Sequence, residues 1–342
     1  MGVDLIKIDS TSSVPKYLQI VDSVLAAVSD GELSRGDKLP SLGAVAKHFG
    51  LSINTVVKAY DVLKRRGLAR ATFGQGFYLS SDQIDVDVNV FALFDEINMF
   101  KEDLYTSFKS ELGEGARVDV FFHHFNSKVF KSLIGDAKGC YTHYVVMPLL
   151  GDEALSALRE LDAGATLLLD RRYRVDGVDF RFVGQDHTGG TRVALETGVE
   201  LIREYSTLRL VEPGRTELEP FSAMIRDGAS SFCRASGVPF TVEKDFDFSG
   251  IRADDVYLVV SERDLVSFVL ACRRGGLEIG RDVGLIAYND MDLREIIDTG
   301  VSSISTDFKR MGRLAAERVL DSGLPGEVIP TELKVRRSLR RC

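Results

Sequence analysis

Residues 38–78 constrain this chain more than any other segment, because they predict two short helices, a tight turn between them and a hairpin. Ser41 can cap a first helix whose apolar residues recur at helical spacing, and Gly50 can end it. Ser52 can cap a second helix, whose apolar stripe would pack on the first. In residues 68–79, short side chains alternate with Gly74 and Gly76, which favours a two-stranded hairpin with a glycine tip, a β-wing. A small, rigid unit of this kind is what insertion of a helix into a DNA groove requires.

This segment is positively charged although the chain as a whole is acidic. Residues 38–80 hold seven Lys or Arg and one acidic residue, whereas the 342-residue chain has 43 basic and 51 acidic side chains. A basic module on an acidic chain favours contact with phosphates, with an affinity that falls as salt rises. A basic helical pair that binds protein is the competing interpretation. Side chains expected to project toward DNA are Asn54, Lys58, Arg65, Arg70, Thr72 and Gln75.

The rest of the chain is long enough for a two-lobed second part. We expect a DNA-binding domain at 1–80, a polar linker at 81–85 and a second domain at 86–342. No 18-residue apolar run predicts a membrane span, and the N-terminus lacks an export signal, so we expect a cytoplasmic protein. Its cysteines are scattered without metal-ligand or disulfide spacing, which predicts reduced thiols, no metal site and no cofactor. These cysteines are Cys140, Cys233, Cys272 and Cys342.

From residue 86, short apolar strands alternate with amphipathic helices, which predicts parallel sheets joined by right-handed crossovers. The first predicted series has strands at 86–94, 117–125, 143–150, 165–170 and 178–184, with helices at 101–112 and 152–161. The second has strands at 209–212, 240–246, 254–260 and 282–288, with helices at 219–236 and 262–275. The fold class is therefore α/β, a winged helix-turn-helix followed by two lobes. A ligand is expected between the lobes, at the carboxyl ends of the strands.

Residues 12–80 resemble a known bacterial family. PKYLQIVDSVLAAVSDGELSRGDKLPS, LSINTVVKAYDVLKRRGL and GQGFYL occur in the order and at the separations of the GntR-type winged-helix domain. Where that family often has Glu-Arg after Pro-Ser, this chain has Leu42 and Gly43, and Asn54 and Lys58 stand where many members have arginine. The operator sequence is therefore left open. The DNA contacts that the resemblance and the wing imply are Ser41, Ser52, Asn54, Thr55, Lys58, Arg70, Thr72, Gln75 and Gly76.

The second part is similar to the effector domain of LacI/GalR regulators, which itself is similar to periplasmic sugar-binding proteins. The resemblance is carried by VGLIAYNDMDLREIIDTGVSSISTDFKRMGRLAAERVL at 283–320 and by FVGQDHTGGTRVALETGVELI at 182–202. It implies a sugar-like effector in the cleft and a homodimer, to which helix 307–320, with Met311, Leu314 and Leu320, would contribute. The effector contacts that it implies are Asn98, Phe100, Glu262, Asn289, Asp290 and one of Arg215 and Arg226.

Further cleft candidates come from the residues themselves. His123 and His124 follow a predicted strand, and because adjacent strand residues point to opposite faces, one of them, taken here as His124, could face a ligand. The same geometry argues against a metal site. Asp186 and His187, in the LacI/GalR-like segment 182–202, could bind the effector or simply cap the helix that follows. For Asn289 and Asp290, a role in a turn competes with ligand contact.

Together these features predict a transcription regulator, a repressor of a carbohydrate-utilisation operon that a monosaccharide or sugar phosphate controls allosterically. Its partners would be double-stranded operator DNA, the effector and a second copy of the chain. An enzyme fused to a DNA-binding module is disfavoured, because the sequence lacks Gly-x-Ser-x-Gly, His-Glu-x-x-His and a phosphate loop. A second alternative, a constitutive DNA-binding protein whose second part only dimerises, is compatible with the sequence. A third, a GntR-type protein with a helical, metal-binding acid sensor, is disfavoured because the second part is rich in predicted strands. The identity of the effector, whether it induces or co-represses, and the target genes stay open.

Overall fold

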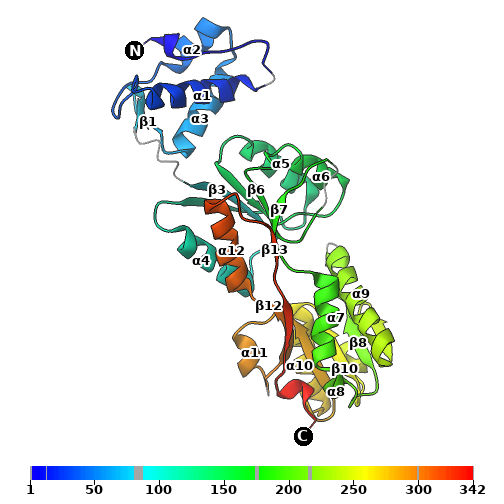
Figure 1. Ribbon diagram of the computed structural model, residues 1–342. Coiled ribbons are helices and arrows are strands. Elements are labelled where there is room, and N and C mark those ends of the chain that lie inside the picture. The colour runs from blue at the N-terminus through cyan, green and yellow to red at the C-terminus, as the bar shows by residue number, and fades with distance from the viewer. Residues whose placement is uncertain are drawn as a thin grey trace.

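The chain forms three successive units in the computed structural model, which describes residues 2–12, 14–80, 88–173, 177–214, 218–298 and 300–341. A winged helix lies at the N-terminal end, lobe 1 follows, and lobe 2 carries the C-terminal end (Figure 1). The predicted linker at 81–85 lies outside the described residues, so the domain boundaries at 80 and 86 stay predictions.

The N-terminal unit is the predicted winged helix. The Ser41 hydroxyl accepts a hydrogen bond from the Ala44 amide at 3.2 Å, and the Ser52 hydroxyl accepts one from the Thr55 amide at 3.1 Å, so both predicted caps are confirmed. Gly50 ends the first of these helices with a φ of 64°, as predicted. The elements are η1 (Val3–Leu5), α1 (Lys16–Ser29), α2 (Leu42–Phe49), α3 (Ile53–Arg65), β1 (Ala69–Thr72) and β2 (Gly76–Leu79).

Lobe 1 is built on a six-stranded parallel sheet in the order β13-β7-β6-β5-β3-β4. Its strands are β3 (Asn89–Phe94), β4 (Arg117–Phe122), β5 (His143–Val146), β6 (Thr166–Asp170), β7 (Arg181–Gly184) and β13 (Glu327–Val328). Its helices are α4 (Met99–Leu112), α5 (Ser127–Ala137), α6 (Asp152–Leu158) and, late in the chain, α12 (Phe308–Leu320). The strand predicted at 117–125 ends at Phe122, because His124 and Phe125 have positive φ angles of 47° and 59°.

Lobe 2 has a second six-stranded sheet in the order β14-β12-β11-β10-β8-β9, parallel except for its β14 edge strand. Its strands are β8 (Leu208–Val211), β9 (Phe240–Glu243), β10 (Val256–Val259), β11 (Gly284–Tyr288), β12 (Ser302–Thr306) and β14 (Thr331–Lys334). Its helices are α7 (His187–Thr197), α8 (Val199–Ile202), α9 (Glu219–Ser236), α10 (Glu262–Gly275) and α11 (Leu293–Ile296), with short turns η3 (Phe248–Gly250) and η4 (Arg337–Leu339).

The chain passes between the lobes three times, after β7, after β12 and after β13, as the order of strands in the two sheets requires. The second passage places α12 on lobe 1, where it packs closely on α4. A Cβ atom added at Gly312 would lie 2.2 Å from the Leu104 carbonyl oxygen, so the two helix backbones are in contact there. Met311 is buried in this packing, so its predicted contribution to a dimer surface is wrong.

Candidate functional site

A cavity of about 720 Å³ lies between the two lobes, at the carboxyl ends of their strands. This is the position at which open parallel sheets bind ligands. Residues of both lobes line it, so closure of the lobes would alter it. The lining residues on which the following paragraphs depend are Asp95, Asn98, Phe100, Lys101, Asp170, Arg171, Gln185, His187, Phe221, Glu262, Asn289 and Phe308.

The lobe 1 wall of the cavity holds a buried network of charges. The Asp95 carboxylate accepts hydrogen bonds from the Lys101 ammonium and, at 2.9 Å, from the Arg171 guanidinium. All three side chains are at least nine-tenths buried. Asp170, which is also buried, accepts a hydrogen bond from Gln185 Nε2 at 2.8 Å. Two carboxylates thus compensate two cations away from water, an arrangement that is costly unless every charge stays paired.

Four buried polar atoms of the cavity residues have no hydrogen-bond partner in the described part of the protein. They are Arg171 Nε, Gln185 Oε1, His187 Nε2 and Asn289 Oδ1. Arg171 Nε lies 3.6 Å and His187 Nε2 lies 3.9 Å from Asp170 Oδ2, both too far for a hydrogen bond. Buried polar groups are normally paired, so these atoms indicate where a polar ligand would complete the site.

Aromatic side chains from both lobes complete the cavity walls. Phe221 lies in T-shaped contact with His187, with ring centroids 4.9 Å apart, and the Arg171 guanidinium lies 5.5 Å from its ring centroid. Phe100 packs on Phe308 with centroids 4.8 Å apart. A ligand that enters the cavity would therefore meet apolar faces as well as polar edges.

Several of the predicted effector residues line this cavity and others do not. Asn98, Phe100, Glu262 and Asn289 line it, and Glu262 is held by Arg294 at 2.5 Å. Asn98 also caps α4 by accepting a hydrogen bond from the Lys101 amide.

The other predicted effector residues have different surroundings. Asp186 caps α7, and the His124 side chain is exposed; neither lines the cavity. Arg226 lies outside the cavity and donates to Glu212 at 2.7 Å. Arg215 lies outside the described residues.

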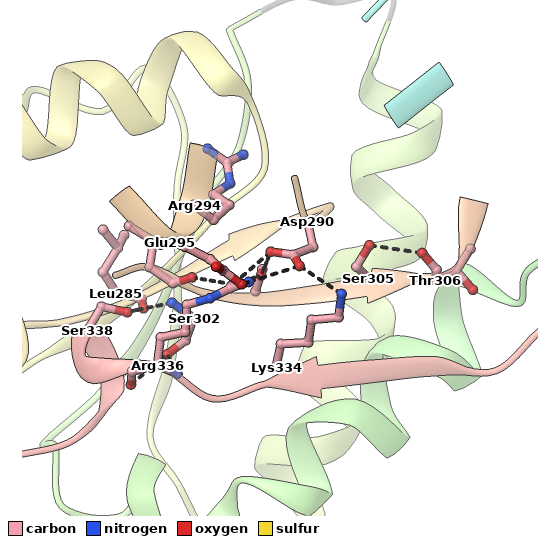
Figure 2. Close-up of polar contacts among 12 residues, drawn as sticks. Leu285, Asp290, Arg294, Glu295, Ser302, Ser305, Thr306, Lys334, Arg336 and Ser338 are labelled. Atoms are coloured by element: carbon pink, nitrogen blue, oxygen red, sulfur yellow. Dashed lines mark hydrogen bonds and ion pairs between the residues drawn. The ribbon is translucent and has the colours of Figure 1, made fainter. Parts of the chain in front are cut away.

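Asp290, two residues after β11, is engaged outside the cavity by β14 and the residues that follow it. Figure 2 shows its carboxylate beside Arg336 and Lys334, with Arg336 Nη1 at 2.7 Å and Lys334 Nζ at 2.9 Å. The carboxylate also accepts a hydrogen bond from the Ser303 hydroxyl. Burial alone would raise the pKa of the Asp290 carboxyl, but hydrogen bonds from these three residues lower it to about 2. Asp290 thus secures β14 to lobe 2, and the structure gives it no contact with the cavity.

Sequence reasoning missed Asp95, Lys101, Asp170, Arg171 and Gln185, which with His187 form the polar centre of the cavity. A signal for three of them was available, because Asp95 and Gln185 directly follow β3 and β7 and Asp170 ends β6. Residues at these positions face the cleft in any open parallel sheet. Lys101 and Arg171 had no such signal, since lysine and arginine are rarely buried.

His187 makes the stability of the cleft sensitive to pH. Burial lowers its pKa to about 4 from an ordinary value of 6.5, so the folded protein binds fewer protons than the unfolded chain between these values. Its contribution to stability is therefore present above pH 6.5 and is lost as the pH falls toward 4. When the pH falls from 7 to 5, the free energy of unfolding of the unaltered protein should drop by about 2 kcal/mol more than that of the His187→Asn variant. Urea unfolding at both pH values measures this difference, and equal losses would contradict it.

The predicted DNA contacts lie on two faces of the winged helix. Ser41 and Ser52 are helix caps, Asn54 and Lys58 are exposed on α3, and Thr55 is half-buried beside them. The wing carries Arg70, Thr72, Gln75 and Gly76, and between them Phe73, which sequence reasoning did not single out, is fully exposed at the tip. Such an exposed ring on a basic wing is available for contact with DNA.

No group of three or more His, Cys, Asp or Glu residues that could hold a metal ion occurs among the described residues. Within the same residues, no helix is both long enough and apolar enough to cross a membrane.

Comparison with known families and proteins assigns the two parts separately. Residues 16–79 match the family of bacterial regulatory proteins called the gntR family, and residues 212–339 match the periplasmic binding protein-like domain. The transcriptional repressor YtrA of Bacillus subtilis is 38% identical over 78 residues, which are 23% of this chain and 60% of YtrA. The mannosyl-D-glycerate transport/metabolism system repressor MngR of Escherichia coli is 33% identical over 82 residues, 24% of this chain and 34% of MngR. The chain thus spans less than two thirds of either relative.

Solved structures match the fold over a longer stretch. A dimeric Lac repressor with an 11-residue C-terminal deletion has a TM-score of 0.63 and 17% identity, covering 74% of this chain and 99% of that one. The Lac repressor bound to ONPG in the repressed state has a TM-score of 0.60 and 15% identity, covering 98% of this chain and 93% of that one. At this identity the likeness concerns the fold. The chain therefore joins a GntR-type helix-turn-helix domain to a periplasmic-binding-protein-like domain with the fold of the Lac repressor.

Proposed function

We propose that the protein is a transcription regulator whose winged helix binds operator DNA and whose inter-lobe cavity binds a small effector. The observation that carries the proposal is a cavity with unpartnered buried polar atoms, on the same chain as a basic GntR-type module. Repression is favoured because YtrA and MngR are both named repressors. The cavity is assigned to binding, with no catalytic role, since the buried Asp95 carboxylate is already paired with two cations and the Asp170 carboxylate is hydrogen-bonded to Gln185.

The cavity favours a neutral, polyhydroxylated effector such as a monosaccharide. Gln185 Oε1 and Asn289 Oδ1 are free acceptors that suit hydroxyl donors, and Phe100, Phe221 and Phe308 offer faces for the apolar side of a sugar ring. A sugar phosphate fits less well. Its negative charge would enter a site whose buried cations, Lys101 and Arg171, already compensate carboxylates.

The proposed regulator acts as a homodimer, and lobe 2 offers a surface for the contact. Val266 and Leu270 on α10 and Leu293 and Ile296 on α11 are exposed, with exposed fractions of 41–74%. The two helices lie next to each other, because Arg294 of α11 donates to Glu262 of α10. Exposed apolar side chains gathered on two neighbouring helices are typical of an interface. Sedimentation velocity should give twice the 37.8 kDa chain mass, and a monomer at micromolar concentration would contradict the proposal.

Linkage between effector and operator tests the function. A thermal-shift screen of monosaccharides and their phosphates should identify a ligand, which at 100 times its dissociation constant adds about 2.7 kcal/mol of stability. That ligand should change operator affinity, and operator should change ligand affinity by the same factor. Calorimetry and fluorescence anisotropy measure the two factors.

Asn289→Ala provides the matched variant for this test. It should abolish the thermal shift and the response to ligand while leaving operator affinity without ligand unchanged, because Asn289 lines the cavity between the lobes and belongs to lobe 2. Ligand affinity that is identical with and without operator would overturn the regulatory proposal. Failure of every sugar to shift the melting temperature would overturn the sugar assignment alone.

A further inference from the structure

The winged helix makes a set of specific contacts with lobe 1. The Tyr17 hydroxyl donates to the Lys138 carbonyl oxygen at 2.9 Å, and the Arg66 guanidinium donates to the Gly139 carbonyl oxygen at 2.9 Å. Leu18 packs against Gly139 so closely that an added Cβ there would lie 2.6 Å from a Leu18 methyl group. One hydrophobic cluster runs without a break from the core of the winged helix into lobe 1. These contacts join α1 and the end of α3 to the loop that follows α5.

The carboxyl end of α3 is bound by lobe 1 as well. The Arg65 carbonyl oxygen accepts hydrogen bonds from Asn89 Nδ2 at 3.3 Å and from Arg117 Nη1 at 3.2 Å. A guanidinium at this end of a helix complements the partial negative charge of its unpaired carbonyl groups. Asn89 is buried, and Asp119 and Tyr141 hold the Arg117 side chain in place through a chain of hydrogen bonds. Lobe 1 therefore presents a formed binding surface, made by Asn89, Arg117, Lys138 and Gly139, which we call the docking surface.

Because of these contacts, the face of α3 that points away from the core of the winged helix lies toward lobe 1. Asn54, Lys58 and Arg65 line a groove of about 530 Å³, whose opposite wall includes Phe121, Leu133 and Tyr141. Figure 1 shows α3 on the side of the winged helix nearest lobe 1. Lys58 lies over the Tyr17 ring, 4.4 Å from its centroid, beside the docking hydrogen bond of Tyr17. A recognition helix in DNA is surrounded by a major groove about 12 Å wide and 8.5 Å deep, so a duplex read by this face of α3 would have to enter the groove between α3 and lobe 1.

We propose that the docking surface holds the winged helix in a state that cannot read DNA, so that docking and operator binding compete. The inference rests on the proposed function, because it assumes that α3 is the helix that enters the DNA groove. Operator affinity is then reduced by the fraction of molecules in which the winged helix is docked. Any change that weakens docking should tighten operator binding, even when the altered residue lies on lobe 1 and touches no DNA.

Arg117→Ala tests the competition by the sign of its effect. Loss of a positive charge ordinarily weakens DNA binding or leaves it unchanged. Competition predicts the opposite, an operator affinity roughly threefold to tenfold higher, the range expected from loss of one ordinary hydrogen bond. Arg117 is half-exposed, so the substitution should leave lobe 1 folded. Arg313→Ala, which removes an exposed arginine of α12 on lobe 1, is the matched control and should show no increase.

Tyr17→Phe provides an independent variant, because it removes only the hydroxyl that donates to Lys138 and changes no charge. It should also raise operator affinity severalfold. In the unaltered protein, operator should increase hydrogen–deuterium exchange of a peptide covering residues 137–142. Operator affinity that is unchanged or lower in both variants, with unaltered exchange at 137–142, would overturn the docking proposal. If the unaltered protein binds no duplex DNA in a genomic selection, the proposed function itself fails.

Discussion

Asp95→Ala should lower the free energy of unfolding by about 3–5 kcal/mol, the cost of removing one partner from a buried ion pair. The Asp95 carboxylate accepts hydrogen bonds from Lys101 and Arg171, and its side chain is 3% exposed. Without it, two cations face only Asp170, so the lobe 1 wall carries an uncompensated buried charge. Urea unfolding at neutral pH measures the loss, and the variant should also lose the thermal shift produced by the effector.

Asp103→Ala is the matched control for this substitution. Asp103 lies on α4, on the same lobe, and pairs with Lys309 at 3.6 Å, but both side chains are about half exposed. Exposed ion pairs contribute little, so the expected loss is below about 1 kcal/mol. Similar losses in the two variants would show that the Asp95 network is not a buried charge cluster. Asp95→Asn, which keeps the shape and part of the hydrogen bonding, should fall between them.

The winged helix could be predicted almost entirely from sequence because its signals are local. Ser41, Ser52 and Gly50 act within one turn of where they stand, as N-caps and as a left-handed helix end. Strand and helix positions in the lobes followed from apolar periodicity for a similar reason. The end of β4 was misplaced because His124 and Phe125 adopt positive φ angles, which non-glycine residues seldom do and which no local signal marked.

The polar centre of the cleft depends on contacts between residues distant in sequence, and here prediction was partial. Asn289 was predicted from the resemblance of its segment to LacI/GalR regulators, which also implied its neighbour Asp290. Asp290 instead pairs with Arg336, a partner 46 residues further along the chain. Asp95 pairs with Arg171 across 76 residues. The strand order of the sheet decides which carboxylate lies next to which cation. This order cannot be predicted from the residues that flank each charge in the sequence. Contacts between separate units, such as those of Tyr17 and Arg65 with lobe 1, leave even less trace.

If α3 reads the operator sequence, removing Asn54 and removing Lys58 should lower operator affinity in two different ways. Asn54→Ala should lower operator affinity roughly 5- to 150-fold if its amide pairs with a base edge, and the dependence of affinity on salt should not change. Lys58→Ala should weaken binding to all sequences and reduce the slope of log affinity against log salt by about one, because one phosphate contact is lost. Fluorescence anisotropy with operator and scrambled duplexes at several salt concentrations separates the two roles.

Docking of the winged helix on lobe 1 affects how these losses are measured. Asn54 and Lys58 also line the groove against lobe 1, so their removal could weaken docking and mask part of the loss. The two substitutions should therefore be made in the Arg117→Ala background, in which the docked state is already depleted. If docking competes with DNA, the losses should be larger there than in the unaltered background. If operator affinity is unchanged by both substitutions in both backgrounds, α3 does not read DNA, and the wing with Arg70 and Phe73 would have to carry the contact.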